Sequence, residues 1–354
     1  MNTENHIPLV EITRGNVVES IHFGSLAIAQ PDGKILFSVG DTTSLFFLRS
    51  TAKPFQALAF LEQGGIEFYN LEPKEIAIMC ASHSGMDEHV KLLEKLQQKI
   101  GIQENLLQCG VHPPIHTETT QKVKMKGEAL HPNQHECSGK HSGMLAFAKM
   151  ISAPLNTYLE ISHPVQRTIL QVFAEMCSYN VKDIQLGTDG CSAPVFAVPL
   201  PNAAVAYARL CQPEKLSAAR AETCRAITAA MISHPEMVAG PWRFDTDVMA
   251  AAKGSLVTKI GAEGYQGIGV MPGEAAKYSS GLGIVIKISD GDLTLRASCV
   301  VAMAVLKKLE VLTTEQIENL NAYDQKAIKN WRGKEVGEIR PSAELLQALS
   351  QLDA

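Results

Sequence analysis

The chain has 354 residues, of which 45% are hydrophobic and 19% charged, and its 32 Lys and Arg against 37 Asp and Glu give a formal net charge of −5. This composition is typical of a globular protein with one large domain or two closely packed ones. No basic surplus is present to neutralise a phosphate backbone, so nucleic acid is not expected as the main partner. The N-terminal segment has no secretory pattern, and no apolar run is long enough to cross a bilayer. We therefore expect a cytoplasmic protein with no membrane partner and with reduced cysteines.

The predicted elements follow a simple order along the chain. The first 48 residues predict strands, because residues 17–29 and 34–40 are rich in β-branched and aromatic side chains on either side of a Pro-Asp-Gly turn. From about residue 50 to 235 the apolar residues recur at three- and four-residue spacing, which predicts helices at 52–63, 87–101, 141–151 and 216–232. Strands return at 255–264, 265–273 and 281–292, before an Ala- and Val-rich helix at about 294–309 and a polar helical tail.

This order favours an α+β fold in which both chain ends share one antiparallel sheet around a helical insertion. We expect a discontinuous sheet domain made of 1–48 and 250–354, and a mainly helical region at 49–249. The cleft between the two parts is the default place for a binding site.

The first candidate for chemistry is the element Ser50-Thr51-Ala52-Lys53. Residues at i and i+3 share one helix face, so the lysine amine can reach the serine hydroxyl. Pro54 indicates that a helix starts close by, because proline is tolerated in the first turn. A serine there lies at the positive end of the helix, and a desolvated lysine can act as its general base. Ser-x-x-Lys is short, however, and a helix start with a surface lysine is the structural alternative.

The context of this element adds weight to the catalytic interpretation. Lys259-Ile260-Gly261 lies in a predicted strand far downstream, and a serine hydrolase with Ser-x-x-Lys at a helix start and Lys-Thr-Gly on a strand has the same order. A second serine usually lies between them on the helical side. Ser82 in Cys80-Ala81-Ser82-His83-Ser84-Gly85 is the candidate, with Ser84 as its substitute. The same segment could instead be a simple turn.

Two further segments are unusually rich in reactive side chains. Residues 136–143 hold a thiol, an amine, an imidazole and two hydroxyls, and residues 188–194 place a carboxylate two positions before a thiol. Neither has the paired spacing of a zinc finger, so the spacing alone gives weak support for a metal. Glycine-rich turns with buried cysteines remain the alternative.

Five segments together resemble the rhizobial-type L-asparaginase family, whose fold is related to that of serine β-lactamases and glutaminases. They are RSTAKP at 49–54, ASHSG at 81–85, CSGKHSGML at 137–145, GTDGCSAP at 187–194 and TKIGAEG at 258–264. The resemblance extends over nearly the whole chain. It implies an amidohydrolase that converts L-asparagine to L-aspartate and ammonia through an acyl-enzyme, and it implies a homodimer.

The resemblance also assigns residues to roles. It implies two Ser-Lys pairs, Ser50 with Lys53 and Ser82 with Lys259, although Lys253 lies close to the last of these in sequence. It implies a zinc site at Cys137, Lys140 and Cys191, in which the lysine can bind metal only if its pKa is lowered. Arg49, Asp189 and His141 are expected to bind substrate or to support the groups that do.

Several other functions stay open at this point. A glutaminase on the same fold differs by one methylene in the pocket, which is worth only about 1–3 kcal/mol. A penicillin-recognising hydrolase is disfavoured because neither Ser-Asp-Asn nor Tyr-x-Asn occurs in the chain. A zinc hydrolase in which Cys137, Cys191 and a histidine hold the catalytic metal, and an amino-acid sensor without turnover, are the alternatives from other classes.

Overall fold

A computed structural model describes residues 5–353 of the chain, and the outermost residues of the expected sheet domain, 1–4 and 354, lie outside this range. The chain forms two compact units. The sheet unit comprises the chain up to Thr51, Val198–Gln212 and the chain from Asp247 onward. The helical unit comprises Ala52–Ala197 and Pro213–Thr246.

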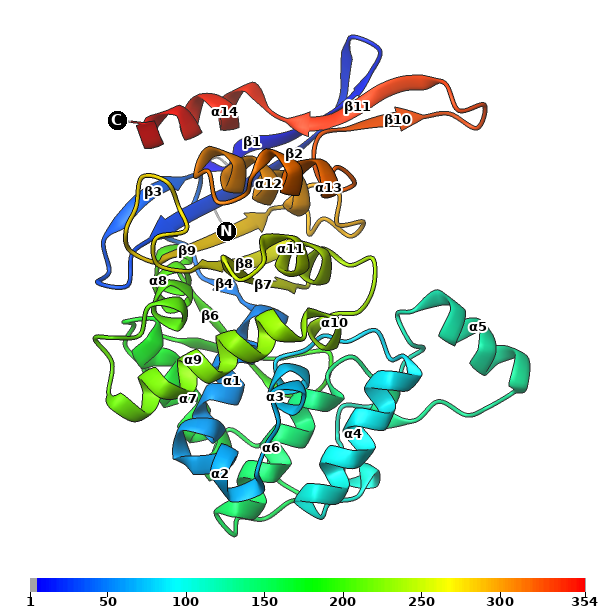
Figure 1. Ribbon diagram of the computed structural model, residues 1–354, viewed down its shortest axis with the longest axis vertical. Coiled ribbons are helices and arrows are strands. Elements are labelled where there is room, and N and C mark those ends of the chain that lie inside the picture. Colours follow the sequence, from blue (N-terminus) through cyan, green and yellow to red (C-terminus); the bar gives the residue numbers. More distant parts are fainter. Residues whose placement is uncertain (1–4, 354) are drawn as a thin grey trace. The chain divides into compact units, whose positions relative to one another are not determined.

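In residues 5–353, eight strands of the sheet unit form one antiparallel sheet with the order β10-β11-β1-β2-β9-β8-β7, and β3 pairs with β2 off this path (Figure 1). The strands are β1 (Ile7–Arg14), β2 (Val17–Ala29), β3 (Ile35–Val39), β7 (Leu256–Gly261), β8 (Tyr265–Val270), β9 (Leu282–Ile288), β10 (Lys326–Lys329) and β11 (Glu335–Pro341). Because β2 from the N-terminal part pairs with β9 from the C-terminal part, the predicted α+β class with an antiparallel sheet built from both chain ends is confirmed.

Every residue of β7, β8 and β9 is buried, so these strands need cover on both faces. Helix α8 (Leu200–Cys211) supplies one cover, and glycines let it come close. A Cβ at Gly283 would lie 1.7 Å from the Ala204 carbonyl oxygen, and one at Gly267 would lie 2.3 Å from the Tyr207 ring. The middle of the chain thus gives a helix to the sheet unit, which the hydrophobic pattern did not indicate.

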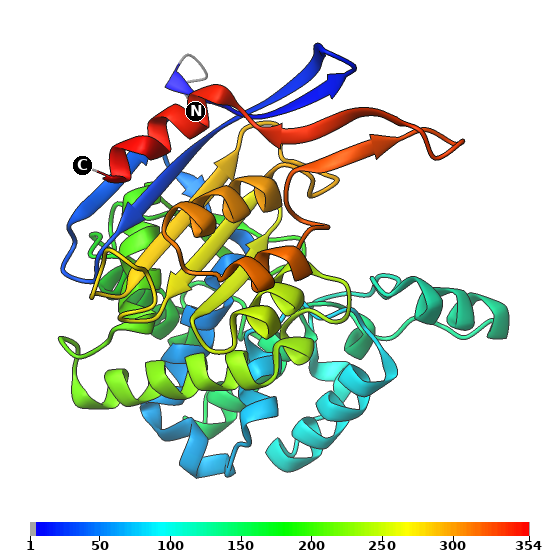
Figure 2. The ribbon, with the colours of Figure 1, turned by 45° about the horizontal axis from the view of Figure 1, so that its top comes forward.

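The other side of the sheet carries α12 (Ser298–Lys308) and α14 (Ala343–Leu349), which lie in front of the strands in Figure 2. Helix α13 (Thr314–Asn319) follows α12. The expected helical tail is wrong between α13 and α14, where β10 and β11 form a hairpin. Ile339 pairs with Ile12 and is the buried residue of this hairpin, while its solvent-facing positions are polar and therefore look like a surface helix in sequence.

The helical unit is built around α1 (Lys53–Phe60), whose eight residues are all buried. A helix that is mainly apolar on all sides must lie inside the molecule. Phe55 packs edge-on against Phe173, and Phe60 lies against Phe147. The other helices of this unit are α2 (Ile66–Tyr69), α3 (Pro73–Met79), α4 (Asp87–Ile100), α5 (Thr117–Lys126), α6 (Ser138–Met150), α7 (Pro164–Met176), α9 (Ala218–Ser233) and α10 (Pro235–Val238).

Helix α6 lies unusually close to α3 in the helical unit. A Cβ at Gly139 would lie only 1.9 Å from the Ile78 carbonyl oxygen, so glycine permits this approach. The unit also contains a hairpin that the sequence pattern did not reveal, β5 (Gln185–Thr188) and β6 (Pro194–Val198). Its connecting turn carries Asp189 and Cys191, and the turn requires a left-handed Ser192 with φ of 69°.

Candidate active site

Ser50 lies in a 3₁₀ turn, Arg49–Ala52, that leads directly into α1. The turn is closed by Thr51, whose amide and hydroxyl both donate to the Leu48 carbonyl, at 3.2 and 2.8 Å. In a 3₁₀ turn the side chains at i and i+3 eclipse, which suits the Ser50–Lys53 spacing. Arg49 has a left-handed φ of 52°, a strained conformation that is common at functional sites. The predicted helix start near Pro54 is confirmed.

Strand β7 runs next to this turn within the sheet unit. A Cβ at Gly261 would lie 2.7 Å from the Leu48 carbonyl oxygen and 3.0 Å from the Thr51 methyl carbon, so glycine allows β7 to touch the segment that carries Ser50. Lys259 lies on the same strand, fully buried, with its amine donating to the Ile260 carbonyl at 2.8 Å. Gly261 therefore lets β7 lie against the turn that carries Ser50.

The helical unit brings Lys53 and Ser82 together. The Lys53 side chain is fully buried, and its Nζ lies 2.7 Å from the Ser82 Oγ and 2.7 Å from the Ala81 carbonyl oxygen. Both partners are uncharged. A buried amine in contact with a serine hydroxyl is an arrangement that can exchange a proton. The pairing of Ser82 with Lys259 and the pairing of Ser50 with Lys53 stay predictions.

The loop that carries Ser82 is held rigidly on several sides. The Ser82 amide donates to the Val238 carbonyl at 2.9 Å, and the Ser84 hydroxyl donates to the Ala239 carbonyl at 2.7 Å. Because the Ser84 hydroxyl is committed to a backbone carbonyl, Ser82 is the serine of this loop that faces an amine. His83 completes the bracing: its Nδ1 accepts from the Gly85 amide, and its Nε2 lies 2.8 Å from the Ser138 Oγ.

Arg243 is a neighbour of Ser82 that the sequence gave no reason to single out. Its Nη1 donates to the Ser82 carbonyl at 2.8 Å, across 161 positions of sequence. No motif surrounds it, and only the path of the chain brings it there.

The second cluster gathers Lys140, Cys191 and Asp189 in the helical unit. The Lys140 Nζ lies 3.0 Å from the Cys191 Sγ and 3.9 Å from the Asp189 Oδ2, and the lysine and the two cysteines are buried. Burial alone lowers the pKa of Lys140, but the Cys191 and Cys137 sulfurs raise it above its ordinary value. The hydrogen bond from Cys137 lowers the pKa of Cys191, whereas the same contact raises that of Cys137. The cluster therefore favours one thiolate beside one ammonium.

His141 lies at the edge of this cluster on α6. Its Nδ1 is 2.6 Å from the Tyr158 hydroxyl, and burial lowers its pKa. Its buried Nε2 has no nitrogen or oxygen partner within residues 5–353, and the Cys191 sulfur is a neighbour of the ring. The hydrogen bond between the ring and the Cys191 sulfur ties His141 to the cluster.

The donor set of this cluster is compatible with zinc. Two cysteine sulfurs are soft donors of the kind that zinc takes, and one of them already favours the thiolate form, whereas the Lys140 amine can bind a metal only after it loses its proton. Within the described range no group of three or more His, Cys, Asp or Glu side chains is arranged to hold a metal, and the third ligand that the sequence suggests is a lysine. All eight cysteines lie within the described residues, are buried and form no disulfide.

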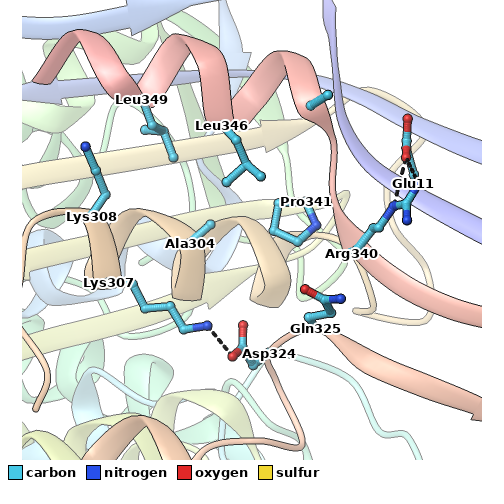
Figure 3. A pocket seen from close by; sticks show the side chains of 11 residues that line it. Glu11, Ala304, Lys307, Lys308, Asp324, Gln325, Arg340, Pro341, Leu346 and Leu349 are labelled. Atoms are coloured by element: carbon cyan, nitrogen blue, oxygen red, sulfur yellow. Dashed lines mark hydrogen bonds and ion pairs between the residues drawn. The ribbon is translucent and has the colours of Figure 1, made fainter. Parts of the chain in front are cut away.

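One hollow of about 670 Å³ in the sheet unit lies away from these residues (Figure 3). It is lined from α12, α14, β1 and β11, among others by Ala304, Leu346 and the ion pairs of Arg340 with Glu11 and of Lys307 with Asp324. None of the predicted site residues lines it. The chemistry-bearing residues are thus recognised by their mutual contacts rather than by this hollow.

Comparison with known proteins identifies the family. No curated protein matches the chain. Solved structures that resemble it include a probable glutaminase from Bacillus subtilis complexed with 6-diazo-5-oxo-L-norleucine, at 14% identity and a TM-score of 0.40, covering 82% of this chain and 84% of that one. A Bacillus glutaminase in 4.3 M NaCl matches at 15% identity and a TM-score of 0.38, covering 82% and 91%.

No helix in residues 5–353 is long and apolar enough to span a membrane. A sequence profile of the family described as L-asparaginase II matches residues 10–341, which is nearly the whole chain and includes every predicted site residue. The chain therefore belongs to the L-asparaginase II family and is an amidohydrolase.

Proposed function

We propose that the protein is an L-asparaginase that hydrolyses L-asparagine to L-aspartate and ammonia through a serine acyl-enzyme. Family membership supports the substrate class. The observation that carries the mechanism is the buried contact of 2.7 Å between the Lys53 amine and the Ser82 hydroxyl. Lys53 itself lies one helical turn after Ser50 in sequence.

In this mechanism the Ser50 hydroxyl attacks the side-chain amide carbon, and the Lys53 amine takes its proton. Backbone N–H groups at the start of α1 stabilise the oxyanion. The proton then passes through the Ser82 hydroxyl, oriented by Lys259, to the departing ammonia. Water hydrolyses the β-aspartyl ester by the reverse path. Asp189 and Arg49 are assigned to the α-amino and α-carboxylate groups of the substrate, with His141 in support.

Zinc held by Cys137, Lys140 and Cys191 is a part of this proposal. A bound zinc ion would keep its sulfur ligands as thiolates and supply positive charge. The Ser-Lys apparatus supplies the nucleophile without it, so a Cys137→Ala variant is expected to lose metal and to raise KM more than it lowers kcat. Metal content measured by elemental analysis provides a readout that does not depend on turnover. Unchanged KM together with no measurable kcat would contradict this role.

A cytoplasmic location and a homodimer complete the proposal. Eight free, buried thiols support a reducing compartment. The homodimer rests on the family resemblance, and light scattering of the purified protein at several concentrations measures it directly.

The deciding experiment is ammonia release from L-asparagine and L-glutamine by the wild type and by Ser50→Ala and Ser82→Ala. Ser84→Ala is the matched control, because it removes a hydroxyl of the same loop that contacts a carbonyl rather than an amine. We expect asparagine turnover that is lost in Ser50→Ala and kept in the control. Preferred turnover of glutamine would replace the substrate. Activity that survives in Ser50→Ala would move the nucleophile to Ser82, and activity that chelation removes would favour a zinc hydrolase.

A further inference from the structure

Arg243 is a half-buried cation whose hydrogen-bonding capacity is mostly unused. A guanidinium has five N–H donors, and the partner that Arg243 shows within residues 5–353 is the Ser82 carbonyl. No carboxylate of the described chain lies within ion-pair distance of it. Placing a charge partly out of water without a counter-ion is costly, so such a group is a candidate for function.

The backbone around Arg243 is built to present it to Ser82. Gly240 has a φ of 116°, and a Cβ there would lie 2.7 Å from the Ser84 Oγ. Trp242 has a left-handed φ of 57°, a strained conformation for a bulky residue. Its ring stacks on His116, whose own amide donates to the Ser84 carbonyl at 3.0 Å. Segment 238–243 and loop 82–84 are therefore tied together, and the strain at Trp242 turns the chain so that Arg243 points at the loop.

Arg243 places a positive charge beside the Ser82 carbonyl. The Lys53 amine contacts the Ser82 hydroxyl. The neighbouring His83 is neutral, because burial first, and then His89 and the nearby cations, hold the pKa of His83 far below its usual value. Burial likewise lowers the pKa of His89. An anionic group of a ligand is the natural complement of this arrangement.

We infer that Arg243 binds the α-carboxylate of the amino-acid substrate, while its bond to the Ser82 carbonyl fixes it relative to the reacting groups. The inference rests on the proposed function. In asparagine three C–C bonds separate the amide carbon from the carboxylate carbon, and the end-to-end distance in the extended molecule is about 4 Å. Arg243 contacts the carbonyl of Ser82, the residue whose hydroxyl takes part in the proposed reaction. Its charge is therefore at a distance that the substrate can span. A carboxylate accepts several donors, so the bond to Arg243 leaves it free to accept others.

The test compares two amides that differ by the α-carboxylate, L-asparagine and 3-aminopropanamide, in the wild type and in Arg243→Gln. Glutamine keeps a polar side chain at this position but carries no charge. We expect kcat/KM for L-asparagine to fall about 10- to 100-fold through KM, because a charge-assisted hydrogen bond is lost. The value for 3-aminopropanamide should not change. Arg243→Lys, which keeps the charge, should retain more of the asparagine activity than Arg243→Gln does.

Controls separate this role from a structural one. Arg167→Gln removes an exposed arginine of α7 and should affect neither substrate. A parallel fall for both amides in Arg243→Gln would show that Arg243 only braces the loop, and would overturn the inference while leaving the proposed function intact. If the wild type releases no ammonia, the proposed function fails instead. Calorimetry with L-aspartate then decides: weaker binding by Arg243→Gln supports the inference, and equal or absent binding overturns it.

Discussion

Two buried lysines of the helical unit have opposite surroundings. Lys53 contacts a carbonyl and a hydroxyl, both neutral, whereas Lys140 lies beside the sulfurs of Cys137 and Cys191 and the carboxylate of Asp189. Both side chains are almost inaccessible to water. Two equally buried lysines therefore differ in their partners: Lys53 contacts neutral groups, and Lys140 is part of a charged cluster.

The difference follows from what a lysine needs in order to act as a base. It must give up its proton, and neutral partners do not oppose this. Anionic partners hold the proton on the amine, and only a competing cation such as a metal can displace it. The surroundings of Lys53 suit proton transfer, and the cluster around Lys140 suits charge balance or metal binding.

The largest effect is expected for Lys53→Met, which tests whether Lys53 transfers a proton. We expect turnover of asparagine to fall about 10²- to 10⁴-fold, which is the usual effect of losing a general base. Stability should fall by only about 1–3 kcal/mol, because the buried Ala81 carbonyl and Ser82 hydroxyl lose the amine that contacts them but no buried charge is left behind. Ammonia release and urea unfolding of the same preparation measure both. A variant with wild-type activity would show that Lys53 moves no proton.

Lys140→Met should have the opposite profile in the metal-free protein. Removing one partner of a buried charged cluster leaves the other uncompensated, which costs about 3–5 kcal/mol. The free energy of unfolding should therefore fall by more than it does in Lys53→Met. Asp189→Asn is the matched control, because it removes the more distant charge of the cluster, 3.9 Å away, and should cost less. Equal stability of Lys140→Met and wild type would mean that the cluster is neutral.

The sequence predicted the reactive residues but not most of their partners. Ser50, Lys53, Ser82, Cys137 and Cys191 lie in short segments where several reactive side chains occur together, and such density is visible without a structure. The strands β7 to β9 and the helices α4 and α9 were predicted because their apolar residues form patterns that are also visible within one segment of the sequence.

The missed features depend on contacts between distant segments. The bond between Arg243 and the Ser82 carbonyl spans 161 positions, and no local pattern reports it. The hairpin of β10 and β11 has one buried residue, Ile339, and gains its register from pairing with β1. A polar segment that becomes a strand through its neighbour cannot be told from a surface helix by periodicity alone.

A glycine substitution tests whether the Lys140 cluster depends on the close packing of α6 against α3. In Gly139→Ala the new Cβ would lie 1.9 Å from the Ile78 carbonyl oxygen, so the helix must shift. We expect a loss of about 1–3 kcal/mol in the free energy of unfolding, as for other overpacked cores. The control is Gly143→Ala, one turn later, whose Cβ would lie 3.3 Å from the flexible Met79 side chain. Equal effects of the two would show that α6 does not need the glycine.

The smallest expected effect concerns two buried histidines, His83, which lies near Lys53, and its neighbour His89. Each ring accepts a backbone N–H at Nδ1 and is neutral, and burial lowers the pKa of both below 6.5. The unfolded chain therefore binds more protons than the folded one below about pH 6.5, so stability is lost as the pH falls from there. Each such histidine adds a slope of up to about 1.4 kcal/mol per pH unit. Urea unfolding between pH 7.5 and 5 should show a smaller slope in His89→Gln than in wild type. Because the slope is compared rather than the stability itself, the hydrogen bonds lost in the variant do not affect the result, and parallel curves would mean that His89 is protonated equally in both states.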